Sequence, residues 1–542
     1  MDTLTINGSK YWLPENEQDV ISLVNDAKQN NEIICLRGAA HSFPLIDTLQ
    51  KGSASGKTYK YVMLSKMFAY KYLGNNLVWV QAGCHLGPDP FDPTGISTLD
   101  NSLLFQLNNP PTPEQPSLSI PDLGGITHQT VGGFLSTSSS GGSTQYSFED
   151  ALMSIDIICY GANGAEKVTF KRPVPDNPDD PFYGAGVATM GLFGIIVSAT
   201  FKCSPQFYIA GQEAITTVDD CAIDLFGDGE AGKPSLATFL KQTEYTRLMW
   251  WPQKKITKMV VWQAGQTDQK GARDWAAQAY KKLGVKPPFP PLKPYQEVPY
   301  LLKSPIPATA AAGLFYTAIG TWPDWLHNLL EDHPFEYEAL KFAVEASFYP
   351  LILPFIMNNV FVKPDAPETG PQQFSDVWYT GLPMDNQISD ELMPVWFTEL
   401  WIPIEDSQNV MNDLLEHYTE GSDDTGAFSC EIYAAKSSPF WFSPSYQQDV
   451  VRIDIFWFAK NKGNPTAFYQ GFWDLLSKYK YRPHWGKYIP DRVKTSEGSN
   501  VPCADYLKEC YQKWNAWMAL REKMDPDQIF LNDYWRSHLG IS

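Results

Sequence analysis

Three short stretches of this sequence carry residue types that bind anions or move protons. The first is RGAAHSF, at positions 37–43, which begins with Arg37, Gly38, Ala39, Ala40, His41 and Ser42. A run of small residues lets the backbone come close to a ligand, and its N–H groups form an anion-binding concavity. Arg37 adds positive charge there, and His41 would project from the pocket wall. An ordinary turn with a partly exposed histidine fits the same letters, so this stretch alone leaves both interpretations open.

The second stretch, LGGITHQTVGGFLSTSSSGGSTQ at positions 123–145, is rich in glycine and hydroxyl side chains. It lacks the lysine of a P-loop and the spaced glycines of a Rossmann fingerprint, and its first half is too apolar for a solvated linker. A backbone wrapped round a pyrophosphate and a flat ring fits better. The residues predicted to bind such a ligand are Thr130, Gly132, Gly133, Ser136, Ser139, Ser140 and Gly141. A further turn that enters a strand adds Gly191, Gly194 and Ile195.

Charged residues inside apolar strands are the remaining candidates for chemistry. Such charges are costly to bury unless they are paired or functional. Arg452 and Asp454 alternate with apolar neighbours, so both face the same side of one strand. Glu399 lies in FTELW, and Glu431 lies in SCEIYAAK two positions before Tyr433. This pattern fits either a structural ion pair of Arg452 with a carboxylate or a carboxylate and an arginine placed above a ligand.

Hydrophobic periodicity places these residues on an α+β framework. Residues 15–30, ENEQDVISLVNDAKQN, have helical spacing, and short strands rich in Val and Trp follow to about residue 206. The next strong strands are MVVWQAG, VWFTELWIPI, FSCEIYAAK and DVVRIDIFWFAKN, which we expect in a sheet with at least one buried face. A Pro-rich connector covers 284–299. Residues 503–524 are expected to form one helix.

Composition excludes several classes of protein. The chain has 542 residues and a formal net charge of −19, which argues against a nucleic-acid partner and against a polybasic membrane anchor. We expect no metal site, because neither HExxH nor CxxC occurs and the 8 cysteines are scattered. The longest apolar run is too short to span a bilayer. With no recognisable leader, we expect a cytoplasmic protein or the mature form of a secreted one.

Four stretches, taken in order, resemble the FAD-binding domain of the vanillyl-alcohol oxidase family: RGAAHSF, VWVQAG, GGITHQTVGGFLSTSSSGGS and GLFGIIVSATF. The resemblance covers about residues 10–205 and implies FAD joined covalently through His41. Bicovalent members carry a cysteine in the glycine-rich segment, and this chain has none there, so a single link is expected. The third stretch, YRPHWGK at positions 481–487, resembles a motif of the family's sugar-alcohol and aldonolactone oxidases. It implies that His484 and Lys487 approach the flavin and that Lys487 stabilises its anionic reduced form.

The same resemblance implies a fold in two parts. A PCMH-type FAD-binding domain takes residues 1–206, and the C-terminal segment 481–542 returns to it. Residues 207–480 would form a substrate-binding domain with a large antiparallel sheet flanked by helices.

The middle of the chain bears on the substrate. Three stretches resemble the substrate domain of the covalent-flavin, type II cholesterol oxidases: VEASFYPLILPFI, FSDVWYTGLPMDNQ and FTELWIPI. Aromatic residues on or beside the strands fit the wide apolar wall of a sterol pocket, although most would be ordinary core. The expected partners are therefore an apolar alcohol and molecular oxygen. Residues 306–322 and 347–357 could also touch a membrane surface transiently during sterol uptake.

The expected reaction is oxidation of the 3β-hydroxyl of a cholesterol-like sterol to a ketone, with O2 reduced to H2O2 and a carboxylate able to shift the double bond. Glu431 and Glu399 are the acid/base candidates, and Arg452 polarises the oxygen. Asp454, Tyr433 and Lys487 complete the predicted catalytic set. The closest alternative is an alditol or aldonolactone oxidase, which shares the flavin domain and PHWGK. The other is a flavin- or ligand-binding protein that has lost its redox chemistry.

Overall fold

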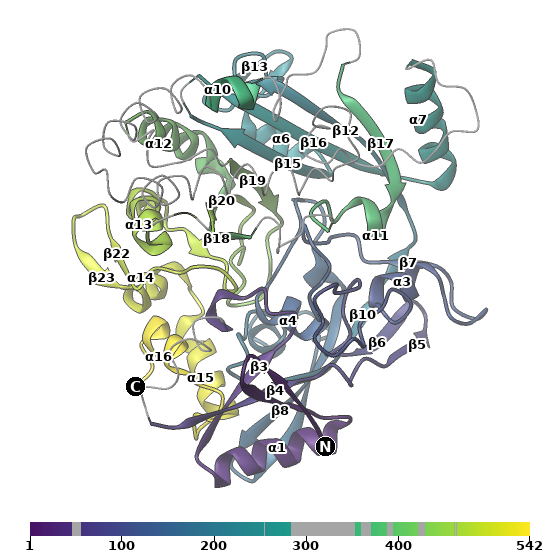
Figure 1. Ribbon diagram of the computed structural model, residues 1–542, viewed down its shortest axis with the longest axis vertical. Helices are drawn as coiled ribbons and strands as arrows, with labels where there is room; N and C mark the ends of the chain where they lie inside the picture. The colour runs from purple at the N-terminus through teal and green to yellow at the C-terminus, as the bar shows by residue number, and fades with distance from the viewer. Residues whose placement is uncertain are drawn as a thin grey trace, which may run out of the picture.

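A computed structural model describes residues 1–45, 56–253, 255–282, 353–358, 370–386, 394–420, 429–459, 461 and 463–542. Helices pack around several sheets, the largest of which is antiparallel, and this arrangement confirms the predicted α+β class (Figure 1). The predicted connector 284–299, the segment 306–322 and most of 347–357 lie outside the described residues. Within the described part of the chain, no helix is both long and apolar enough to cross a membrane.

The N-terminal sheet has four strands in the order β1-β2-β4-β3. Its strands are β1 (Asp2–Ile6), β2 (Ser9–Leu13), β3 (Glu32–Arg37) and β4 (Thr58–Met63). Between them lies the predicted helix, α1 (Glu17–Gln29), which buries one apolar stripe that includes Val20 and Val24. The Asn16 side chain accepts a hydrogen bond from the Asp19 N–H and so caps the start of this helix.

A second, antiparallel sheet has five strands in the order β5-β6-β10-β8-β9. They are β5 (Tyr70–Gly74), β6 (Leu77–Gln81), β8 (Leu152–Gly161), β9 (Gly164–Lys171) and β10 (Ile195–Lys202). The predicted glycine turn leads into β10. Gly191 and Gly194 have φ of +74° and +128° there, and a Cβ on Gly194 would lie 2.3 Å from the Ile158 carbonyl oxygen.

The third sheet has eight strands in the order β17-β12-β16-β15-β19-β20-β18-β21, all antiparallel. They are β12 (Tyr208–Thr217), β15 (Tyr245–Trp251), β16 (Lys258–Thr267), β17 (Gln372–Val377), β18 (Val395–Pro403), β19 (Cys430–Ala435), β20 (Val450–Phe458) and β21 (Arg482–Pro483). In the chain this sheet begins with β12, just after residue 206. Its edge strand β21, however, comes from beyond the predicted boundary at 480.

The two faces of the eight-stranded sheet differ in polarity. Helices α12 (Ser407–Glu420) and α13 (Pro465–Leu476) pack on an apolar face, where Trp250 meets Tyr418 at 5.5 Å and Trp473 donates to the Thr398 hydroxyl. Charged side chains occupy the opposite face, which meets the glycine-rich segment. The sheet therefore positions the polar groups against the N-terminal part of the chain.

Shorter elements connect and cover the sheets. The short strands are β7 (Leu118–Ser119), β11 (Ser204–Pro205), β13 (Gly229–Glu230), β14 (Lys233–Pro234), β22 (Arg492–Lys494) and β23 (Asn500–Pro502). The further helices before residue 407 are α3 (Leu103–Asn108), α4 (Val131–Ser136), η1 (Phe148–Ala151), α5 (Phe182–Ala185), α6 (Leu236–Gln242), α7 (Gln269–Lys282), α10 (Leu353–Ile356), α11 (Trp378–Gly381) and η5 (Ile404–Asp406). After α13 the chain adds η6 (Ser477–Tyr479), α14 (Cys503–Cys510), α15 (Trp514–Met524) and α16 (Asp533–Leu539).

The prediction of one helix over 503–524 is wrong, because α14 and α15 are separate. The chain leaves the helix at Tyr511, whose backbone is extended, with φ −112° and ψ 107°. The Tyr511 ring stacks on Phe442 at 4.8 Å and on Trp485 at 5.6 Å. Burial of this ring against the rest of the molecule outweighs continuation of the helix.

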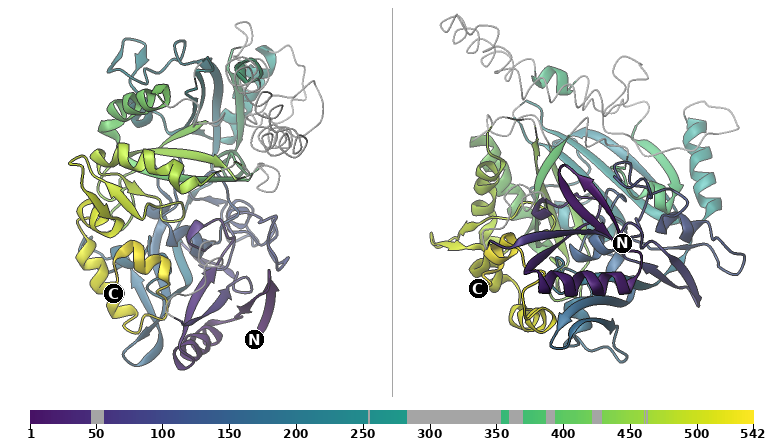
Figure 2. Two further views of the ribbon diagram at one scale, coloured as in Figure 1. Left: turned by 60° about the vertical axis from the view of Figure 1, so that its left-hand side comes forward. Right: turned by 60° about the horizontal axis from the view of Figure 1, so that its bottom comes forward.

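The C-terminal segment lies beside the N-terminal sheets, and both termini lie in the same half of the molecule (Figures 1 and 2). The Ile34 N–H donates to the Ile529 carbonyl at 2.8 Å, and the Phe43 N–H donates to the Gly486 carbonyl at 3.0 Å. On these contacts we propose the division into 1–206, 207–480 and 481–542.

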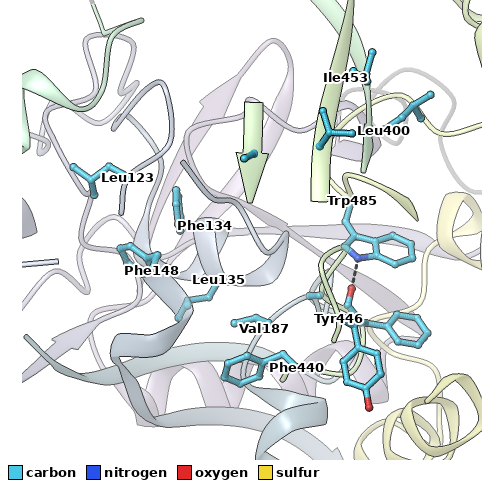
Figure 3. Packing of buried hydrophobic residues seen from close by; sticks show 14 of the residues in the cluster. Leu123, Phe134, Leu135, Phe148, Val187, Leu400, Phe440, Tyr446, Ile453 and Trp485 are labelled. Atoms are coloured by element: carbon cyan, nitrogen blue, oxygen red, sulfur yellow. Dashed lines mark hydrogen bonds between the residues drawn. The ribbon is translucent and has the colours of Figure 1, made fainter. Parts of the chain in front are cut away.

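One hydrophobic cluster runs through both parts of the chain. It joins Phe134 and Phe148, near the glycine-rich segment, to Leu400 and Ile453 of the eight-stranded sheet (Figure 3). In the same view the Trp485 indole donates to the Phe442 carbonyl at 2.7 Å. Because the core is continuous, the sheets hold one another in a fixed arrangement around the polar groups.

Candidate active site and cofactor cavity

The RGAAHSF stretch forms a turn at the end of β3, and this turn touches the glycine-rich segment. Ala40 adopts a left-handed backbone with φ +61°. A Cβ on Gly38 would lie 2.8 Å from the Thr130 hydroxyl oxygen, so only glycine fits there without a shift. Two of the stretches singled out in the sequence therefore meet in space.

A large cavity opens between these two stretches and the C-terminal segment. Most of the predicted cofactor-binding residues line it: Arg37, Gly38, Ala39, Ala40, His41, Ser42, Thr130, Gly132, Gly133, Ser136, Ser139, Gly191, His484 and Lys487. Ser140 and Gly141 line a smaller neighbouring cavity instead. Gly194 and Ile195 line neither, since Gly194 shapes the turn before β10 and Ile195 is buried in the core.

The lining of the large cavity fits FAD. Buried Arg37 Nε has no hydrogen-bond partner among the described residues, as expected of a donor that meets a phosphate oxygen. At Gly132 the backbone packs so tightly that a Cβ would lie 3.2 Å from the Ala82 carbonyl oxygen. Small residues, hydroxyl groups and one arginine thus surround a space with both polar and apolar walls, which suits a pyrophosphate joined to an aromatic ring.

His41 lies in this wall as a neutral imidazole. Burial, together with the positive charges of Lys487 and Arg37, lowers the pKa of His41 to about 4. Its ring centroid lies 5.7 Å from that of His128. A neutral imidazole nitrogen is nucleophilic, so the protonation state of His41 suits covalent attachment.

The YRPHWGK stretch contacts both the glycine-rich segment and the eight-stranded sheet. His484 Nδ1 accepts from the Gly486 N–H at 3.1 Å, which leaves Nε2 as the donor to the Ser139 hydroxyl at 3.2 Å. Burial lowers the pKa of His484 to about 4. The His484 N–H donates to the Glu399 carbonyl, and Lys487 Nζ lies 3.9 Å from the centre of the Phe397 ring. This stretch is therefore packed inside the protein and is not a surface turn.

The five predicted catalytic residues of the sheet share its charged face. Arg452 on β20 is paired with Trp401 on one side and Tyr433 on the other. Asp454, two residues on, is paired in the same way with Glu399 and Glu431. The alternation seen in the sequence thus gathers these residues on adjacent strands, and all of them are buried.

Arg452 is held from several directions. Its Nε and Nη2 donate to Glu399 Oε1 at 2.8 and 2.7 Å, and its Nη1 donates to the carbonyls of Ser140 and Gly141 at 3.0 and 2.8 Å. The guanidinium lies 4.7 Å from the ring centres of both Trp401 and Tyr433. The ion pair of Arg452 with a carboxylate therefore exists, and it also ties the sheet to the glycine-rich segment.

The carboxyl groups beside Arg452 have opposite pKa shifts. Burial alone would raise the pKa of Glu399, but the positive charges nearby, chiefly that of Arg452 and also that of Lys487, outweigh burial and lower this pKa. Burial and the adjacent Glu399 charge raise the pKa of Asp454 well above its usual range. These shifts favour a charged Glu399 next to an uncharged Asp454.

Glu431 has a different partner, which the sequence analysis missed. It accepts from Arg247 on β15, and Arg247 also pairs with Asp385 at 2.8 Å. Arg247 lies in the apolar strand YTRLMWW. A charged residue inside an apolar strand is the same signal that indicated Arg452, so Arg247 was predictable in that way. No local signal points to Asp385.

Two buried carboxyl groups that hold the glycine-rich segment were also missed. Asp122 Oδ2 accepts from the Ser140 hydroxyl at 2.9 Å and from the Gly141 N–H at 3.0 Å. Glu149 accepts hydrogen bonds from the hydroxyls of Ser138, Ser438 and Ser443. Burial raises the pKa of Glu149 to about 7. These partners are 11 to 294 residues away from Glu149 in sequence, beyond any local pattern.

Comparisons with known proteins bear on this site. A model of the D-arabinono-1,4-lactone oxidase family matches residues 321–538. L-gulonolactone oxidase of Scyliorhinus torazame is 20% identical over 97% of this chain and 93% of its own length. D-arabinono-1,4-lactone oxidase of Saccharomyces cerevisiae is 25% identical over 49% of this chain and 43% of its own length. The solved structure of cholesterol oxidase from B. sterolicum matches with a TM-score of 0.64 at 15% identity, over 98% of this chain and 94% of that chain.

These similarities confirm the expected fold and enzyme class, and they bear on the expected substrate. The likeness to cholesterol oxidase confirms the predicted fold, with its PCMH-type FAD-binding part and large antiparallel sheet. The relatives confirm an FAD-dependent oxidase that acts on CH–OH donors. They favour the aldonolactone alternative over the sterol interpretation, because sequence similarity points to lactone oxidases and the sterol enzyme is similar in fold only.

Proposed function

We propose that this protein oxidises a secondary hydroxyl group of a sugar 1,4-lactone to a carbonyl group and uses O2 as the electron acceptor. The observation that carries the proposal is the charged face of the eight-stranded sheet. Five buried ionisable side chains from four adjacent strands, β15, β19, β20 and β18, share that face: Arg247, Glu431, Arg452, Asp454 and Glu399. A substrate with many hydroxyl groups can add hydrogen bonds to such a surface at several points, whereas a sterol offers it a single hydroxyl group.

FAD, when bound, supplies the acceptor for a hydride and passes the electron pair to O2, which yields H2O2. The residues proposed to hold it are those that line the large cavity. Arg37 and the backbone of the glycine-rich segment would bind the pyrophosphate. His41, as a neutral nucleophile, would form the single covalent link, and Lys487 would place a positive charge beside the ring.

The charged face would bind and activate the lactone. Arg452 is fixed by Glu399 and by two backbone carbonyls, so its guanidinium is pre-organised to polarise the reacting oxygen. The nearby positive charges lower the pKa of Glu399, and its backbone carbonyl accepts from the backbone N–H of His484, so we assign Glu399 as the acceptor of the hydroxyl proton. Glu431, bound to Arg247, would position the substrate. Asp454 is protonated and would donate a hydrogen bond.

A substrate panel tests this proposal directly. Purified holoenzyme is supplied with D-arabinono-1,4-lactone, L-gulono-1,4-lactone, xylitol or cholesterol, and H2O2 release is followed together with reduction of an artificial electron acceptor. We expect kcat/KM for a lactone to exceed that for cholesterol by at least about 100-fold, a difference of roughly 3 kcal/mol in transition-state binding. Faster oxidation of cholesterol would restore the sterol interpretation. Bleaching of the flavin without H2O2 would assign a dehydrogenase.

A further inference from the structure

A second, smaller cavity lies beside the charged face. Its lining comes from the sheet, the glycine-rich segment and the turn after α11: Tyr245, Thr246, Trp262, Tyr433 and Arg452, then Leu123, Gly125, Ser140, Gly141 and Gly142, then Leu382 and Met384. Its volume of about 40 Å³ exceeds the roughly 10–15 Å³ that a single water needs. A hydroxyl-bearing group of a ligand therefore fits.

Trp262, which lines this cavity, carries a buried donor. The side chain is 2% exposed, and its Nε1–H has no hydrogen-bond acceptor among the described residues. A buried donor without an acceptor costs about 1–3 kcal/mol, and most buried donors in native proteins have a partner. An oxygen atom inside the cavity would remove that cost.

The position of Trp262 is fixed by its neighbours. On β16 it is paired with Glu213 on one side and with Arg247 on the other, so it shares the charged face. Its ring stacks on Phe374, with centroids 5.1 Å apart and planes 17° apart. The indole is therefore a rigid part of the same surface that carries Glu431 and Arg452.

We propose that the smaller cavity is a substrate subsite that binds a hydroxyl oxygen of the lactone and that Trp262 Nε1–H donates to this oxygen. This inference rests on the proposed lactone oxidation and adds a specificity determinant to it. Arg452 and Tyr433 line both the subsite and the candidate catalytic surface. A hydroxyl held in the cavity would thus orient the rest of the lactone along the charged face, and a lactone without hydroxyl groups would lose that contact.

The test compares W262F with W517F. Both replacements keep an aromatic ring and remove one indole N–H. Trp517 is a matched control, since it is fully buried, its Nε1 also lacks an acceptor among the described residues, and it lines neither cavity. Its ring packs on Phe193 and Phe442 at 4.9 and 4.1 Å.

Two measurements are made on the holoenzymes. Steady-state kinetics give KM and kcat for D-arabinono-1,4-lactone. Anaerobic calorimetry on dithionite-reduced enzyme gives the Kd of the same lactone without turnover, and the Kd of γ-butyrolactone, which has no hydroxyl group. We expect W262F to weaken binding of the sugar lactone about tenfold, the equivalent of one hydrogen bond, with kcat within about twofold of the parent. Binding of γ-butyrolactone should stay unchanged in both variants.

Three results would overturn the inference. Parent-like binding by W262F would mean that water alone satisfies the indole. Equal losses in W262F and W517F would mean a general packing effect. Equal weakening of the binding of both lactones in W262F would show that the contact with Trp262 does not depend on a hydroxyl group of the lactone. The proposed function fails in a distinguishable way, namely when the parent enzyme itself neither binds nor oxidises the sugar lactone.

Discussion

Asp454 lies opposite Glu399 across β20 and β18, and the pKa values of these neighbouring carboxyl groups are shifted in opposite directions. The positive charges of Arg452 and Lys487 lower the pKa of Glu399 and so favour its ionised form. Burial and the negative charge of Glu399 raise the pKa of Asp454 and so favour its protonated form. These shifts favour a single negative charge on the pair, which would match the single charge of Arg452.

This difference predicts unequal effects of two similar replacements. D454N replaces a neutral carboxyl group with a neutral amide, so we expect the free energy of unfolding to change by less than about 1 kcal/mol. E399Q removes the charge that pairs with Arg452, and loss of one partner of a buried pair costs about 3–5 kcal/mol. Equilibrium unfolding in urea at pH 7 measures both. Equal destabilisation would contradict the assigned protonation states.

The geometry around Arg452 predicts that lysine cannot replace it. R452K keeps the charge but loses the planar group that reaches Glu399 and two carbonyl oxygens together. We expect kcat/KM for the lactone to fall about 100- to 1,000-fold while the flavin content stays unchanged. R521K, at a buried arginine paired with Asp525, is the control and should retain activity. A fully active R452K would show that the guanidinium group of Arg452 is not needed for catalysis.

The environment of His41 predicts a covalent flavin. Acid denaturation should leave the yellow colour with the parent polypeptide and release it from H41A. The reason is that a neutral imidazole in the cavity wall can form the link and alanine cannot. Mass spectrometry of the intact chain should show the added mass of FAD in the parent only. Colour released from both proteins would refute covalent attachment through His41.

Glu149 predicts a pH dependence of stability. Its pKa is about 7 in the folded protein against 4.5 for an ordinary glutamic acid, so folding favours the protonated form. The stabilisation is complete below about pH 4.5 and is lost as the pH rises through 7, by about 3 kcal/mol in total. E149Q stays neutral, so its free energy of unfolding relative to the parent should rise between pH 5 and pH 8. A difference that is independent of pH would contradict this assignment.

Local patterns in the sequence were enough to predict much of the framework. Helix α1 and strands such as β18 and β20 follow from periodicity, and alternation correctly placed Arg452 and Asp454 on one face. The turn at Gly191 and Gly194 also follows from local signals. These features depend on residues only a few positions apart, which a single sequence records directly.

The partners across the molecule could not be predicted in this way. Asp385 meets Arg247, and Glu149 meets Ser443, only because distant segments pack together. The break at Tyr511 has the same origin, since its ring is buried against Phe442. The evidence on the substrate divides in the same way: aromatic composition is visible in the sequence, whereas the gathering of charges on one face, which supports the proposed lactone, appears only when β15, β19, β20 and β18 lie side by side.

Strand β21 has a consequence for the order in which the protein can be assembled during synthesis. It closes the edge of β18, through pairs of Leu400 with Pro483 and Trp401 with Arg482, yet it is translated about 80 residues after that strand. Until then this part of the edge of β18 has no partner strand, and an unpaired strand edge is a template for intermolecular pairing. Chaperone dependence and aggregation of ribosome-bound intermediates should therefore end abruptly once residues 482–483 leave the exit tunnel.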